Sequence, residues 1–86
     1  MSLEVVFTHS AWEDYLFWQN NNLKISKRIN QLIKECMRHP FTGIGKPEAL
    51  KFSLSGFWSR RINDEHRIVY KVDADKLFII QCRYHY

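Results

Sequence analysis

The sequence predicts a small α+β domain in which an N-terminal strand and two helices precede an antiparallel meander of strands. Three observations support this fold. A short β-branched and aromatic run opens the chain, two segments with helical periodicity follow, and the second half alternates short apolar runs with polar turns. We expect both helices to pack on one face of a twisted sheet. With 86 residues, the chain should form a single domain over residues 1–86.

A strand and a first helix are expected at the N-terminus. Residues 3–7 are mostly β-branched or aromatic, as in a strand. Ser10 and Glu13 have the spacing of a capping box, so we expect the helix to begin at Ser10. The run Asn20–Asn22 should end this helix and cap the next one. The apolar stripe of the first helix is expected to comprise Trp12, Tyr15, Leu16, Trp18 and Gln19.

The second helix is amphipathic and strongly basic on one side. Its apolar stripe is Ile25, Ile29, Leu32, Ile33 and Cys36, and its cations are Lys24, Lys27, Arg28, Lys34 and Arg38. Glu35 is the one acid among them. A solvated face is one interpretation of this pattern, and a surface that faces RNA or DNA is the other. Pro40 should end the helix at His39, because the residue before a proline avoids the α region.

The second half of the chain should form the strands 50–54, 57–62, 67–72 and 77–85, joined by short turns. Residues two apart on a strand share a face. Ile68, Tyr70 and Val72 should therefore face the helices. Leu77, Ile79, Gln81, Arg83 and His85 should share one face of the last strand.

Basic groups and one imidazole are expected to converge on the sheet face away from the helices. They are Arg61, Arg67, Arg83 and His85, and Glu48, the carboxylate nearest in sequence to Lys51, could reach the rim of this surface. A carboxylate, an imidazole and guanidinium groups are the groups that metal-free RNA cleavage by the ribose 2′-hydroxyl needs, and this reaction yields a 2′,3′-cyclic phosphate and a 5′-hydroxyl. The alternatives are solvated arginines, a surface histidine, and a weak surface ion pair between Glu48 and Lys51.

Charge and cysteine content limit the classes of function. The formal charge is −3 for residues 1–23 and +7 for residues 24–86, which favours a polyanionic partner or serves solubility. The sequence has neither an apolar run long enough for a membrane span nor a signal-peptide pattern, so we expect a cytoplasmic protein. Cys36 and Cys82 should be reduced core residues, and their spacing to histidines does not complete a zinc motif. We expect neither a metal nor a cofactor.

Five segments resemble the YoeB toxins, which belong to the RelE-like superfamily of bacterial toxin–antitoxin systems. They are residues 12–15, 45–48, 54–62, 66–70 and 82–86, so the resemblance runs over nearly the whole chain. The block from Gly56 to Arg61 and the last five residues are the most specific parts. Ala49 departs from the pattern, since many relatives have a second proline there, and this leaves the Glu48 loop slightly less rigid.

The resemblance implies a RelE-like fold and a ribosome-dependent mRNA endonuclease that cuts in the decoding site and inhibits translation. It also implies inhibition by a YefM-like antitoxin and a homodimer. By position, Glu48 matches the general base, Arg67 the phosphate-stabilising arginine and His85 the general acid, while Tyr86 completes the site. Lys51 and Arg61 match residues that hold the scissile phosphate, and the cations of the second helix would face ribosomal RNA.

The same residues allow two alternatives to a nuclease. A non-catalytic RNA- or ribosome-binding module would use the same basic face without Glu48 or His85. A gyrase-poisoning toxin of the same superfamily would not require Glu48, Arg67 and His85 together, so their presence argues against it. If the site is catalytic, the α-carboxylate of Tyr86 should favour the protonated form of His85.

Overall fold

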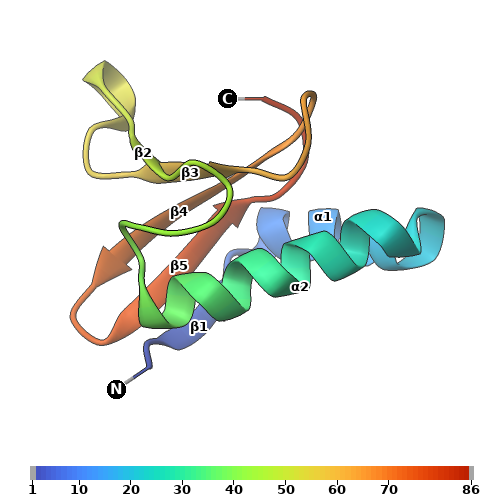
Figure 1. Ribbon diagram of the computed structural model, residues 1–86, viewed down its shortest axis with the longest axis horizontal. Helices are drawn as coiled ribbons and strands as arrows, with labels where there is room; N and C mark the ends of the chain where they lie inside the picture. Colours follow the sequence, from blue (N-terminus) through green and yellow to red (C-terminus); the bar gives the residue numbers. More distant parts are fainter. Residues whose placement is uncertain (1, 86) are drawn as a thin grey trace.

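The computed structural model describes residues 2–85 and contains one five-stranded sheet with two helices beside it. In chain order the elements are β1 (Glu4–Phe7), α1 (His9–Asn21), α2 (Leu23–Arg38), β2 (Glu48–Ala49), the 3₁₀ turn η1 (Phe52–Leu54), β3 (Trp58–Arg61), β4 (Arg67–Asp73) and β5 (Lys76–Gln81). The strand order across the sheet is β1-β5-β4-β3-β2, in which β1 runs parallel to β5 and the other pairs are antiparallel. Both helices lie on the same side of the sheet (Figure 1), which confirms the predicted α+β fold.

The hydrophobic core lies between the sheet and the two helices. The predicted stripe of α2 is confirmed, because Ile29, Leu32, Ile33 and Cys36 are buried and Ile25 is half-buried. The sheet contributes mainly Ile68, Tyr70, Leu77 and Ile79 to the same cluster. Cys36 and Cys82 are both free thiols in the core, as expected.

The start of α1 differs from the prediction. Its N-cap is Thr8, whose Oγ1 accepts a hydrogen bond of 3.1 Å from the N–H of Ala11, so the helix begins at His9 and Ser10 is not the cap. Thr8 Oγ1 also donates to the carbonyl of Ile80 at 3.3 Å, which links the cap to β5. The N-cap of α2 is Asn22, as predicted, since its Oδ1 accepts from the N–H of Ile25.

The buried stripe of α1 was predicted only in part. Ala11 and Trp18, seven residues apart, are its buried residues, whereas Trp12 is 45 % exposed. The small side chain of Ala11 lets the helix approach the sheet closely, and its carbonyl lies 3.6 Å from the Sγ of Cys82. The predicted stripe of α1 was chosen from its large side chains, so it did not include Ala11 or its contact with Cys82.

Two of the predicted strands are also wrong in extent. The expected strand 50–54 is replaced by the two-residue β2 and the turn η1, because Phe52 has a φ of +57°, which an extended strand does not allow. The last strand ends at Gln81 instead of continuing to His85. Within residues 2–85, neither helix is long and apolar enough to cross a membrane.

Candidate active site

Glu48, Arg61 and Arg67 project from one face of the sheet. Glu48 is opposite Ser59, Ser59 is opposite Val69, and Arg61 is opposite Arg67 in the next row. Opposed residues and residues two apart on a strand share a face, so these side chains point away from the core. From the usual spacing between strands and rise per residue, the Cα atoms of Glu48 and Arg67 are about 12 Å apart.

The guanidinium of Arg67 is fixed to the turn that precedes β4. The side chain is only 8 % exposed, and its Nη1 donates to the carbonyls of Asn63 at 2.7 Å and His66 at 3.0 Å. These bonds orient the cation on a short turn whose own backbone is closed by Asn63 Oδ1. Arg61, in contrast, is exposed at the neighbouring position of β3.

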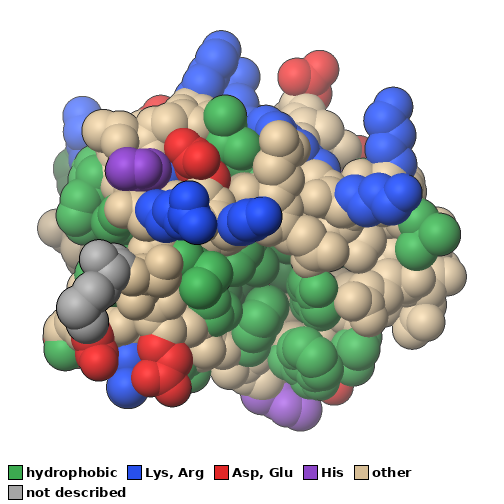
Figure 2. All heavy atoms as spheres, turned by 60° about the horizontal axis from the view of Figure 1, so that its bottom comes forward, with side chains coloured by type: hydrophobic (Ala, Val, Ile, Leu, Met, Phe, Trp, Pro, Cys, Tyr) green, Lys and Arg blue, Asp and Glu red, His purple; other side chains and the backbone are tan. Residues whose placement is uncertain are grey.

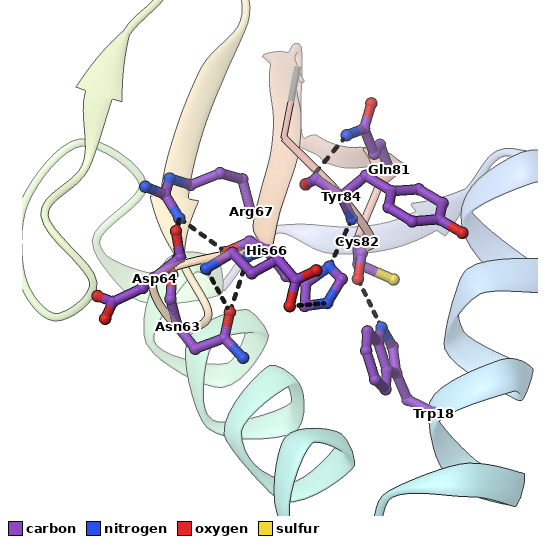
Figure 3. A network of polar contacts seen from close by, with 9 residues as sticks. Trp18, Asn63, Asp64, His66, Arg67, Gln81, Cys82 and Tyr84 are labelled. Carbon is purple, nitrogen blue, oxygen red and sulfur yellow. Dashed lines mark hydrogen bonds and ion pairs between the residues drawn. The ribbon is translucent and has the colours of Figure 1, made fainter.

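The segment after β5 is held against this turn. Tyr84 donates its N–H to Nδ1 of His66 at 2.7 Å and accepts a bond of 3.0 Å from the backbone N–H of Arg67 at its carbonyl. Upstream, the indole of Trp18 donates to the carbonyl of Cys82 at 2.8 Å (Figure 3). His85 follows Tyr84 directly, so its backbone lies beside that of Arg67.

A β-bulge sets the direction of this segment. Val69 pairs with Gln81 and the next residue, Tyr70, pairs with Ile79, which leaves Ile80 as the extra residue. The bulge therefore reverses the alternation: Ile79 faces the core, whereas Gln81 shares the outer face with Val69. The prediction that Leu77, Ile79, Gln81, Arg83 and His85 share one face is wrong for this reason.

Arg83 does not join the outer face either. Its guanidinium carbon lies 3.5 Å from the ring centroid of Phe17 on α1 and 4.6 Å from that of Tyr84. The chain turns after Gln81 and Tyr84 adopts a φ of +65°, so the alternation of a strand no longer applies. Arg83 thus stabilises the segment after β5, residues 82–85, through cation–π contacts. We call this segment the tail. Arg83 is therefore no longer a candidate phosphate ligand.

Glu48 and His85 line two different hollows of the surface. One is lined by Glu48, Ala49, Leu50, Lys51, Phe52 and Leu54, and the side chain of Lys51 is exposed there. Phe52, which is 93 % exposed, stands at its edge. The other contains His85 together with Gln81, Arg83, Tyr84 and the start of α1. Tyr86 lies outside the described residues.

Arg60 is a central residue that the sequence analysis missed. It is completely buried, and its Nη1 donates to the carbonyl of Ile44 at 2.9 Å. Its Nη2 donates to the carbonyls of Thr42, at 2.8 Å, and His39. Its Nε donates to the hydroxyl of Tyr70. Arg60 therefore fastens the loop between α2 and β2 to the sheet.

This loop leads directly into Glu48, the first residue of β2, so Arg60 fixes the segment from which that side chain is presented. Gly45 accepts a bond of 2.7 Å from the N–H of Arg61 and has a φ of +81°, and a Cβ there would lie 2.7 Å from a methyl group of Leu32. The sequence held a signal for a buried Arg60, because it lies two residues from both Trp58 and Ile62, which belong to or pack against the core. Burial of Arg60 was not predicted because arginine side chains are seldom fully buried.

The basic side of α2 is exposed. Lys24, Lys27, Lys34 and Arg38 are exposed and Arg28 is half-buried. A row of Lys and Arg side chains crosses the face on which α2 lies (Figure 2). Among residues 2–85, no three His, Cys, Asp or Glu side chains gather closely enough to hold a metal ion.

Burial controls the titration of the core groups. It raises the pKa of the Cys82 thiol to about 12, with a smaller contribution from the carboxylate of Asp14. It also raises the pKa of Cys36 and of the Tyr70 hydroxyl. These core groups are therefore neutral at physiological pH.

Comparison with known proteins identifies the family. Residues 7–86 match the YoeB-like toxins of bacterial type II toxin–antitoxin systems. Toxin YoeB of Escherichia coli K12 is 55 % identical, over 98 % of this chain and 100 % of that protein. Among solved structures, the YoeB/ParE toxin from Agrobacterium tumefaciens is 49 % identical, with a TM-score of 0.96, and covers 98 % of this chain and 100 % of its own.

YoeB from Staphylococcus aureus has been solved in two states that are both similar to this chain. The dimer is 48 % identical, with a TM-score of 0.91, and the YoeB–YefM complex is 49 % identical, with a TM-score of 0.90. Both comparisons cover 100 % of this chain and 100 % of the other. The chain therefore belongs to the YoeB family of toxins of bacterial type II toxin–antitoxin systems.

Proposed function

We propose that this toxin is a ribosome-dependent mRNA endoribonuclease that cuts in the decoding site and so inhibits translation. The observation that supports it best is the pair of hydrogen bonds that hold Tyr84 against His66 and Arg67. Because of these bonds, the backbone of His85 lies beside that of Arg67, whose guanidinium is anchored to the turn 63–66, and Glu48 projects from the same sheet. Membership of the YoeB family supports the same proposal.

In the proposed reaction, Glu48 removes the proton from a ribose 2′-hydroxyl, and that oxygen attacks the adjacent phosphorus. Arg67 stabilises the charge that develops on the phosphoryl oxygens, and Arg61 and Lys51 hold the same phosphate. His85 donates a proton to the departing 5′-oxygen. The P–O5′ bond breaks, and the products are a 2′,3′-cyclic phosphate and a 5′-hydroxyl. No metal or cofactor is required, and DNA is excluded because it lacks the nucleophile.

The spacing of the groups is compatible with this assignment. A Glu48 carboxylate and an Arg67 guanidinium whose Cα atoms are about 12 Å apart can reach inward to the same phosphodiester group. Arg67 is already oriented by its bonds to the turn 63–66, so little entropy is lost when it binds the phosphate. Tyr86 would complete the site next to His85.

The partners we propose follow from the charge of the molecule and from its relatives. The cations of α2 would bind the backbone of ribosomal RNA, because they are exposed on one face. A YefM-like antitoxin would inhibit the toxin, and two copies would form a homodimer, as in the Staphylococcus aureus structures. A cytoplasmic location would follow from ribosome binding.

Primer extension on a translated mRNA tests the proposal. The wild-type protein should cut the message only when ribosomes are present. The variants E48A, R67A and H85A should each lower the single-turnover rate by about 10²–10⁴. H39A, which alters an exposed histidine at the end of α2, is the matched control and should cut at the wild-type rate.

Two results would contradict the assignment. If E48A and H85A cut as fast as wild type, then these residues are not the base and the acid. If the wild-type protein binds ribosomes but leaves every message intact, it is a non-catalytic ribosome-binding module.

A further inference from the structure

We infer that His66 is a positioning residue for the proposed general acid His85, and that it acts by accepting the backbone N–H of Tyr84. This inference rests on the proposed function. The residue is buried, ends the turn 63–66 and directly precedes Arg67, the first residue of β4. No role in the reaction scheme above requires it, so its placement needs a separate explanation.

The tail needs such an acceptor because it has left the sheet. A residue that continued β5 would donate its N–H to a backbone carbonyl of β4, but β5 ends at Gln81 after the bulge. At Tyr84 the Nδ1 of His66 takes the place of that carbonyl, at 2.7 Å. Tyr84 also has a φ of +65°, which a residue with a side chain adopts only where its surroundings enforce it.

The imidazole is itself held in a defined orientation. Its ring packs edge-on against Trp18, with a centroid distance of 4.8 Å and an interplanar angle of 76°. The same indole donates to the carbonyl of Cys82, so Trp18 and His66 fix two points of the tail (Figure 3). Because Nδ1 accepts, the proton of the neutral ring is on Nε2, which lies 3.6 Å from a carboxylate oxygen of Glu65.

Both polar backbone atoms of Tyr84 are thereby fixed by two adjacent residues, His66 and Arg67. The N–H is bound by His66 and the carbonyl by the N–H of Arg67, with the Nε2 of Gln81 at 3.4 Å from the same oxygen. The next residue is His85. Without the acceptor of His66, the segment after β5 should become more mobile. The proposed general acid His85 would then be misplaced relative to the phosphate held by Arg67.

The variants H66F and H66N separate the acceptor from the ring. Phenylalanine keeps an aromatic ring against Trp18 but has no acceptor, whereas the Oδ1 of asparagine occupies nearly the position of Nδ1. H66F should lower kcat by about 10²-fold with KM for the ribosome unchanged, as expected for a misplaced catalytic group. H66N should restore most of kcat. H39F, the same substitution at an exposed histidine, should match wild type.

A second readout does not depend on catalysis. Amide hydrogen exchange of Tyr84, followed by NMR in the free toxin, should be protected in wild type and H66N. In H66F it should be faster by about tenfold or more. Normal kcat in folded H66F, or a Tyr84 amide that stays protected in it, would overturn the inference.

A measurement on the wild-type protein covers the case in which H66F does not fold. A scalar coupling across the N–H···N hydrogen bond should link the Tyr84 amide to Nδ1 of His66. Its absence, or a proton found on Nδ1, would overturn the inference. If these NMR results hold but wild-type toxin cuts no message, the proposed function fails and the tail geometry stands.

Discussion

Replacement of Arg60 by methionine should destabilise the protein far more than the same replacement of Arg61. Arg60 is completely buried and its guanidinium satisfies three carbonyls and one hydroxyl. Methionine keeps the apolar stem but leaves the carbonyls of the loop without their donor. Each unsatisfied buried group costs about 1–3 kcal/mol.

The net effect on the free energy of unfolding should be about 3–5 kcal/mol, the usual cost of removing one partner from a buried charged network. It is smaller than the sum over the lost bonds because the desolvation cost of the guanidinium also disappears and the loop can open to water. A small domain has about 5–15 kcal/mol in total, so R60M should lose a large share of its free energy of unfolding.

Urea unfolding followed by tryptophan fluorescence measures the difference. The midpoint of R60M should lie about 2–4 M below that of wild type. R61M changes an exposed arginine on the same strand, so its free energy of unfolding should lie within about 0.5 kcal/mol of wild type. R61M should nevertheless cut messages more slowly, since Arg61 is assigned to the phosphate. An R60M protein within about 1 kcal/mol of wild type would refute the reasoning about the buried network.

Three further predictions concern the proposed acid and base, the basic helix and the core thiol. The E48Q and H85Q variants, which keep side-chain size, should lower single-turnover cleavage by about 10²–10⁴ without changing ribosome affinity, and an intact rate in either would remove that residue from the mechanism. Replacement of both Lys27 and Lys34 by glutamine should weaken ribosome binding and reduce the slope of log K against log salt by about 2, whereas an unchanged slope would exclude contacts with RNA phosphates. Burial raises the pKa of Cys82 from an unfolded value of 9.0 to about 12, so the contribution of the buried thiol to stability is complete below pH 9 and is lost as the pH rises towards 12. The urea midpoint of a C82A variant should therefore fall less than that of wild type between pH 9 and 12. An identical fall in both proteins would refute the assignment.

The local patterns predicted the framework of the fold. The period of α2 and the alternation of Ile68 and Tyr70 gave the correct core faces, because these residues lie in regular elements whose burial follows their periodicity. The capping residue of α1 was misplaced for a different reason. Thr8 and Ser10 are both good caps, and Thr8 is selected by its tertiary contact with Ile80, which no local pattern contains.

The candidate site was harder to predict because its geometry depends on interruptions of regular structure. The bulge at Ile80 moves Gln81 to the outer face, and the turn after it sends Arg83 to Phe17. The roles of His66 and Arg60 depend on contacts with residues 18 and 21 positions away in the sequence. Motif resemblance named Glu48, Arg67 and His85 without this geometry, and their catalytic roles remain predictions.

The central claim is that the ribose 2′-hydroxyl of the message is the nucleophile, and one substitution in the substrate tests it directly. The test message is translated on ribosomes with the wild-type toxin, either all-ribose or with a single 2′-deoxynucleotide immediately 5′ to the cleaved bond. The account predicts that the all-ribose message is cut to a 2′,3′-cyclic phosphate and a 5′-hydroxyl, and that the deoxy-substituted message stays whole at that bond. Cleavage of the substituted bond at the normal rate would contradict it.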